Sequence, residues 1–66
     1  MNLGKNIEKL RKKAGLSREK FAFKCGGKFT SLHLMRVEKG TVKNPGINMV
    51  MEIAKALNIS VDELLK

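Results

Sequence analysis

The sequence has one cysteine, no tryptophan and no tyrosine, and these scarcities exclude several classes of protein. A lone cysteine, Cys25, excludes a disulfide within the chain and is typical of a reducing compartment. Three phenylalanines offer little surface on which single-stranded bases could stack. No run of about 18 apolar residues exists, so no membrane-spanning helix is expected. Because the segment MNLGKNIEKL lacks the apolar core of a signal peptide, we expect a cytoplasmic protein.

The sequence also lacks the residues that a metal site or an enzyme active site would need. Cys25 and His33 cannot supply the three or four ligands of a zinc site. The chain of 66 residues forms one domain, residues 1–66, and is too short to enclose a deep pocket within a scaffold. We therefore expect no metal, no cofactor, no small-molecule ligand and no enzymatic activity.

Acidic residues are scarce, and the resulting positive charge is unevenly distributed. Fourteen lysines and arginines face six acidic residues, for a formal charge of +8. Residues 1–43 hold twelve basic and three acidic residues, giving +9, whereas residues 44–66 hold two and three, giving −1. Such asymmetry indicates a polyanionic partner on one side of the protein. The alternative is a solvated basic surface that serves solubility.

What the sequence does contain is helical periodicity. We predict five short helices, over residues 3–14, 18–25, 31–39, 47–57 and 61–65, and no strands. The inward stripes of the first, second and fourth are Leu3, Ile7, Leu10 and Ala14; Phe21, Ala22 and Cys25; and Ile47, Val50, Ala54 and Leu57.

Helix-capping residues stand at the ends of these segments. Ser17 and Thr30 are placed as N-caps, and Ser60 opens a capping box with Glu63. Asn58 is placed to end the fourth helix. These positions fix where the predicted helices begin and end.

The glycine pair Gly26–Gly27, followed by Lys28, could belong to a phosphate-binding loop. Such a loop needs two glycines five residues apart, a lysine and a serine or threonine, between a strand and a helix. Here Ala22 and Phe29 occupy two of those positions, and a helix comes before the glycines. The glycines are better explained as a tight turn between two steeply crossing helices, as in helix-turn-helix proteins.

Three segments, LRKKAGLSREKFA, MRVEKG and NPGINMVMEIAKALNISVDELL, resemble the helix-turn-helix domains of the phage repressor and Cro family, the Xre-like regulators. The resemblance extends from about Leu3 to Leu65. It implies an all-α, five-helix bundle of the lambda-repressor-like DNA-binding class. In that arrangement the helices over 18–25 and 31–39 form the motif, and the second enters the major groove of double-stranded DNA.

The sequence departs from the family pattern at three places. The turn at residues 26–29 is two residues longer than usual. Arg18 stands where relatives usually carry glutamine, and Leu32 where they often carry a polar side chain that reads bases.

A helical wheel divides the helix over 31–39 into two sides. Leu34, Val37 and Glu38 face inward, whereas Leu32, Met35, Arg36 and Lys39 face outward with Ser31 at the flank. The resemblance implies an ion pair between Glu38 and Arg11, the alternative being two independent surface charges. Phe23 and Phe29 are expected to cover each other around the glycines.

The outward side would contact DNA. Arg36 can donate two hydrogen bonds to guanine, Leu32 can pack on a thymine methyl group, and Ser31 can reach a base edge. Met35 either touches the groove wall, fills a gap beside the long turn or is simply exposed. The predicted phosphate contacts are Ser17, Arg18, Lys28, Thr30, Lys39 and Lys43, although each lysine could equally be solvated.

We therefore predict a sequence-specific transcriptional regulator, either a repressor or a controller that both represses and activates. A symmetric homodimer is expected, since two recognition helices match a palindrome. Its predicted interface comprises the apolar residues of the last helix, Val61, Leu64 and Leu65, and the resemblance implies further contacts at the loop before the fourth helix, including Pro45 and Ile47. The alternative is a monomer that pairs only on DNA. Two other functions are possible from the sequence: a protein-interaction module such as an antitoxin or anti-repressor, and a nonspecific binder of RNA or anionic surfaces.

Overall fold

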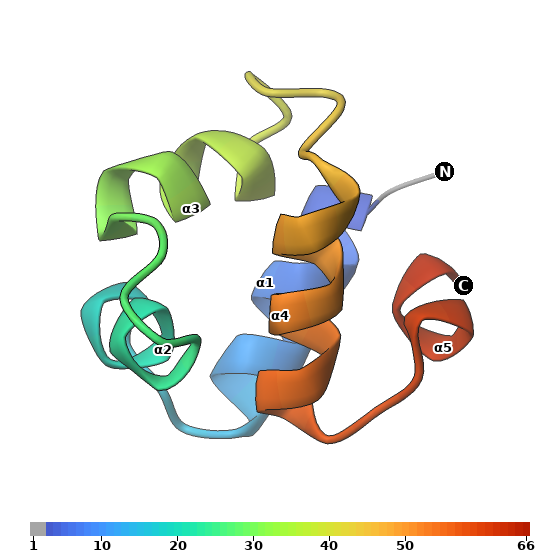
Figure 1. The fold of residues 1–66 in the computed structure, drawn as a ribbon, viewed down its shortest axis with the longest axis horizontal. Helices are drawn as coiled ribbons and strands as arrows, with labels where there is room; N and C mark the ends of the chain where they lie inside the picture. Colours follow the sequence, from blue (N-terminus) through green and yellow to red (C-terminus); the bar gives the residue numbers. More distant parts are fainter. Residues whose placement is uncertain (1–2) are drawn as a thin grey trace.

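The computed structural model describes residues 3–66, and these residues form five α-helices and no β-strand (Figure 1). The helices are α1 (Leu3–Lys13), α2 (Arg18–Lys24), α3 (Ser31–Glu38), α4 (Ile47–Leu57) and α5 (Val61–Leu65). The predicted all-α fold class is confirmed, and the predicted helix ends lie within one residue of those observed.

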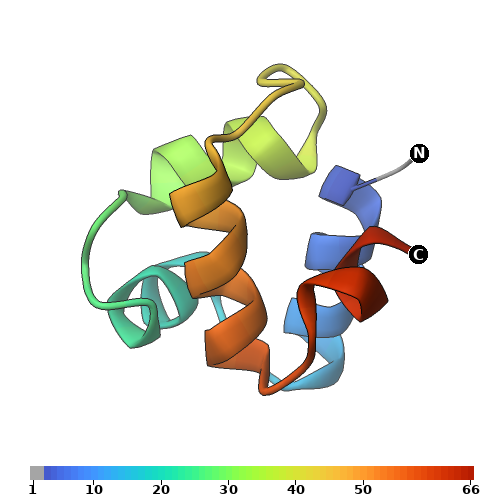
Figure 2. The ribbon, with the colours of Figure 1, turned by 45° about the vertical axis from the view of Figure 1, so that its right-hand side comes forward.

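Helix α1 is the element on which the others assemble. It contacts α3, α4 and α5, while α2 packs on α3 and α5 packs on α4. Figures 1 and 2 show α2 and α3 on one side of α4 and α5 on the other. A hydrogen bond from Asn6 Nδ2 to the carbonyl oxygen of Leu64, at 3.1 Å, ties α5 to α1. Helices α2 and α3 therefore lie on the side of α4 opposite to α5.

The predicted caps are present at the helix ends. The hydroxyl groups of Ser17 and Thr30 accept hydrogen bonds from backbone N–H groups in the first turns of α2 and α3, both at 3.1 Å. Ser60 and Glu63 form the complete capping box at α5. Asn58 ends α4 in the left-handed conformation, with φ of 58°. Each cap satisfies backbone groups that the helix itself leaves unpaired.

The turn between α2 and α3 requires its two glycines. Gly26 and Gly27 have φ of 90° and 67°, a region that side chains with a Cβ atom rarely adopt. The N–H of Gly27 donates to the carbonyl oxygen of Ala22 at 3.1 Å, which closes the end of α2. The glycines therefore end one helix and reverse the chain towards the next.

Every helix contributes at least one side chain with no exposed surface to the core. These residues are Ile7, Phe21, Leu34, Ile53 and Leu64, each 0% exposed. A core built from all five helices fixes α2 and α3 relative to the rest of the bundle.

The structure corrects three predictions about apolar residues. Ala14, predicted on the inward stripe of α1, is exposed and lies just after the end of that helix. Ile47, predicted on the inward stripe of α4, is 64% exposed, and Ile53 takes the buried position instead. Phe23 and Phe29 do not cover each other: Phe23 is 84% exposed, whereas Phe29 is partly buried and lies near His33, with ring centroids 6.5 Å apart. The glycine turn leads Phe29 back onto the core and leaves Phe23 on the outer face of α2.

Candidate nucleic-acid interface

Helix α3 has one buried side and one exposed side. Leu34, Val37 and Glu38 are buried, as the helical wheel predicts. The opposite side, here called the recognition face, carries the exposed Leu32, Arg36 and Lys39 and the partly exposed Ser31 and Met35. The fold thus leaves two apolar side chains, one hydroxyl group and two cationic groups, counting Lys39 at the end of α3, open to a partner.

A shallow groove lies between the start of α2 and the recognition face. Its lining consists of Arg11, Ser17, Arg18, Glu19, Ser31, Leu32 and Met35. Ser17 and Ser31 are therefore brought together, although thirteen residues separate them in the sequence. The cap bond at Ser17 uses its oxygen as an acceptor, so the hydroxyl hydrogen can still be donated to an anion.

Beneath this groove the carboxylate of Glu38 is bound by two arginines. Arg11 Nε donates to Oε2 of Glu38 at 2.7 Å, and Arg11 Nη2 donates to Oε1 at 3.2 Å. Arg18 Nε donates to the same Oε1 at 2.9 Å. The structure thus contains the predicted pair of Arg11 and Glu38 and adds Arg18 as a second cation. The buried charge is fully hydrogen-bonded, as a buried carboxylate must be.

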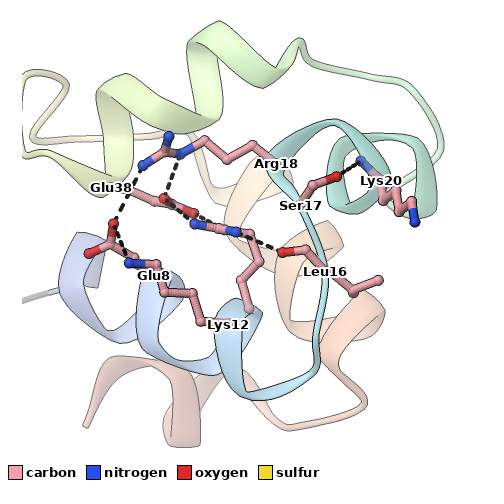
Figure 3. A network of polar contacts seen from close by, with 8 residues as sticks. Glu8, Lys12, Leu16, Ser17, Arg18, Lys20 and Glu38 are labelled. Atoms are coloured by element: carbon pink, nitrogen blue, oxygen red, sulfur yellow. Dashed lines mark hydrogen bonds and ion pairs between the residues drawn. The ribbon is translucent and has the colours of Figure 1, made fainter.

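Further polar contacts extend from these residues (Figure 3). Arg11 Nη1 donates to the carbonyl oxygen of Leu16 at 2.7 Å, which fixes the turn before α2. Arg18 Nη2 also reaches Glu8 at 3.4 Å, and Glu8 pairs with Lys12 at 3.6 Å. We call Glu8, Arg11, Lys12, Arg18 and Glu38 the carboxylate network.

The side chain of Arg18, a predicted phosphate contact, is directed towards two carboxylates and remains partly exposed. Figure 3 shows it reaching from the start of α2 towards Glu38 and Glu8. Its side chain is 30% exposed, and its guanidinium group is bonded to both carboxylates. Sequence reasoning missed these contacts because they join residues ten and twenty positions apart on three helices.

Comparison with protein families gives one result for the chain. A model of the helix-turn-helix family matches residues 7–64. The chain belongs to the helix-turn-helix family of Xre-like and Cro-like regulators. Comparison with curated proteins and with solved structures found no match.

As a member of this family, the chain is a DNA-binding helix-turn-helix regulator. The resemblance noted above implies that α2 and α3 are the two helices of the motif, and the glycine turn joins them. The family is one of DNA-binding proteins and is not typically enzymatic. No described helix is long and apolar enough to cross a membrane.

Two of the regulator's predicted phosphate contacts lie in a second concave surface. This cleft lies between the start of α1 and the α3–α4 loop, and it is lined by Leu3, Gly4, Lys5, Val37, Glu38, Lys39, Gly40, Val42, Lys43 and Pro45. Lys5, which sequence reasoning did not select, joins Lys39 and Lys43 there. All three lysines are exposed, so the cleft is cationic at its rim.

The other predicted contacts are placed differently. Lys28, in the lengthened turn, pairs with Glu52 of α4 at 3.4 Å, yet 68% of its side chain is exposed. Thr30 is exposed and caps α3. The turn of this regulator is thus attached to α4, and Lys28 remains accessible to solvent.

Of the residues predicted for a dimer interface, Leu64 does not lie at the surface. It is 0% exposed and belongs to the core, so it cannot contact a second copy without unfolding α5. Val61, Leu65 and Pro45 are partly exposed, and Ile47 is largely exposed. The core thus takes one of the three apolar residues of α5 and leaves the other two at the surface.

Cys25 has a structural role in the regulator. It lies 2% exposed in the core. Burial raises the pKa of its thiol from 9.0 to about 11, with a further contribution from the nearby carboxylate of Glu52. Within residues 3–66, no group of three or more potential ligands could hold a metal ion.

Proposed function

We propose that this regulator recognises a specific palindromic operator by placing α3 in the major groove, and that it represses or controls transcription from that site. The observation that carries the proposal is the division of α3. Its buried side is fixed by Leu34, Val37 and the doubly paired Glu38, while Leu32 and Arg36 are exposed. A recognition helix needs such a rigid inner side and such a free outer side.

Base recognition is assigned to the recognition face. Arg36 donates two hydrogen bonds to O6 and N7 of a guanine, Leu32 packs on a thymine methyl group, and Ser31 reaches a neighbouring base edge. Exposure of Arg36 and Leu32 supports the assignment, because neither side chain is occupied by the fold. These base contacts would determine which DNA sequence the regulator binds.

Phosphate contacts would hold the regulator in register. We assign them to Ser17, Thr30, Lys28, Lys39 and Lys43. The exposed Lys39 and Lys43 of the α3–α4 loop support this, as does the formal charge of +9 on residues 1–43. Because a palindrome needs two recognition helices, we also propose a homodimer acting in the cytoplasm.

A protein-interaction module is the second candidate. It is favoured by Leu32, a large apolar residue that is 51% exposed where a DNA-reading helix often carries a polar one. An antitoxin or anti-repressor would use the same face against a protein. The positive charge around the motif favours DNA.

One experiment separates these functions. The upstream DNA of the chain's own gene, fluorescently labelled, is titrated at fixed salt against scrambled DNA of equal length. Specific recognition predicts a preference of about a thousandfold or more. Equal binding to both DNAs would indicate a nonspecific binder, and no binding to either would favour the protein-interaction module.

A further inference from the structure

Arg18 occupies an unusual position in the motif. It is the first residue of α2, and its side chain reaches the last residue of α3 by the 2.9 Å bond from Nε to Glu38. This bond directly joins the two helices of the motif. Arg11, by contrast, joins α1 to α3. Glu38 is thus shared between the helix that supports α3 and the helix that precedes it.

The charges around Arg18 are nearly balanced. Two carboxylates, Glu8 and Glu38, face three cations in the carboxylate network, which leaves a net charge of +1. A DNA phosphate that bound Arg18 through Nε or Nη2 would compete with Glu38 or Glu8, and loss of the Nε bond would leave the buried Oε1 of Glu38 with Arg11 Nη2 alone. Breaking a buried charge pair costs more free energy than a new, solvent-exposed pair contributes.

We propose that Arg18 is a positioning residue, which sets the angle of α3 against α2 through Glu38, and that it is not a phosphate contact. This inference rests on the proposed function, since it describes how the recognition face is held for base reading. The last turn of α3 is anchored through Glu38, and Arg36 of the recognition face lies two residues before it. A small rotation of α3 about that anchor would move Arg36 and Leu32 off their bases.

The decisive variant is Arg18→Lys, which keeps the charge but cannot bind two carboxylates with a planar fork. We expect binding to the operator to weaken about three- to thirtyfold, while binding to scrambled DNA stays within about twofold. The slope of log affinity against log salt should not change. Arg18→Gln should behave in the same way, and Lys24→Gln, which removes an exposed charge from the same helix, should not lower specificity.

A phosphate contact predicts a different pattern. Arg18→Lys would then keep its affinity, and Arg18→Gln would weaken both DNAs alike and flatten the salt slope by about one unit. Glu8→Gln adds a further arm: stronger binding with a steeper slope would mean that Glu8 withholds Arg18 from phosphate. Any of these results would overturn the positioning role. All affinities are measured at a temperature at which circular dichroism shows each variant to be folded.

The wild-type protein offers a test that does not depend on variants folding. The Nε–H proton of Arg18, observed by ¹H–¹⁵N NMR, should carry the downfield shift of a carboxylate-bonded group in the free protein and keep it on operator DNA. Loss of that shift on DNA would contradict the inference. A wild-type protein that does not prefer its operator would refute the proposed function instead, because the free-protein signal would still report the bond to Glu38.

Discussion

Gly4, in the first turn of α1, lies against the backbone carbonyl oxygens of Val37 and Glu38 at the end of α3. A Cβ atom at Gly4 would overlap the oxygen of Val37 and come within 2.7 Å of that of Glu38. The last turn of α3 therefore meets α1 twice: at Gly4 through its backbone and at Arg11 through the side chain of Glu38. Both contacts set the position of the recognition face.

This packing predicts that a substitution at Gly4 lowers the stability of the protein, whereas helix propensity alone would predict an increase. Alanine is about 1 kcal/mol better than glycine in a helix, so Gly4→Ala would stabilise an isolated α1. Because the methyl group overlaps backbone atoms, we expect the free energy of unfolding to fall by about 1–3 kcal/mol instead. Urea denaturation measures it. Gly46→Ala is the control, since no atom lies within 4 Å of a Cβ built there and its change should stay within about 1 kcal/mol.

The doubly paired Glu38 predicts unequal effects of removing its partners. Glu38→Leu leaves the buried Arg11 without a carboxylate and Arg18 with Glu8 alone, and should cost about 3–5 kcal/mol of stability. Arg11→Met should cost less, because Arg18 still binds the carboxylate. The double variant should be more stable than the sum of the two losses predicts. Additive shifts in the denaturation midpoints would show that the two groups do not interact.

The buried thiol predicts a pH dependence of stability. The folded protein holds the pKa of Cys25 at about 11, above the 9.0 of an accessible thiol. The unfolded chain therefore loses its proton first, and this contribution to stability is complete below pH 9.0 and lost as the pH rises towards about 11. Over that window, wild type should lose about 2–3 kcal/mol more than Cys25→Ala. Parallel stability curves would contradict the raised pKa.

Local signals account for most of what the sequence predicted correctly. A helix start is encoded by a side chain that can cap it, and Ser17, Thr30 and Ser60 do so within their own three following residues. The two sides of α3 follow from the 3.6-residue period, which also needs no knowledge of other helices. These features could therefore be read without a structure.

The features that the sequence did not predict depend on how the helices pack against one another. On a helical wheel Ile47 and Ile53 lie about 60° on either side of Val50, so the period cannot decide which is buried. The neighbouring helices decide it, and they bury Ile53. The approach of Gly4 to α3 and the contacts of Arg18 with two carboxylates are of the same kind, because they join residues far apart in the sequence.

Base reading by Arg36 predicts a loss confined to specific DNA. Arg36→Ala should weaken binding to the operator by about 1–3 kcal/mol and relax the preference at one base pair. Lys43→Ala is the matched comparison: as a phosphate contact, it should weaken operator and scrambled DNA alike and lower the salt slope by about one unit. Equal losses on both DNAs for Arg36→Ala would remove it from the base contacts.

The last prediction concerns the working unit. One recognition helix contacts only a few base pairs, whereas two, about 34–36 Å apart, match a palindrome. With Leu64 in the core, the surface left for pairing comprises Val61, Leu65, Pro45 and Ile47. Ile47 is the most informative position, because it is 64% exposed and its replacement should not disturb the core.

Sedimentation equilibrium at micromolar concentration should find a dimer for wild type and a monomer for Ile47→Lys or Leu65→Lys. Phe23→Lys is the control: it also replaces an exposed apolar residue with lysine, but on α2, away from the proposed interface. It should therefore remain dimeric. The monomeric variants should lose most of their affinity for the full palindrome and little for a single half-site, because only the palindrome needs two coupled recognition helices. A monomeric wild type that bound a half-site as tightly as the palindrome would show that pairing has no part in recognition.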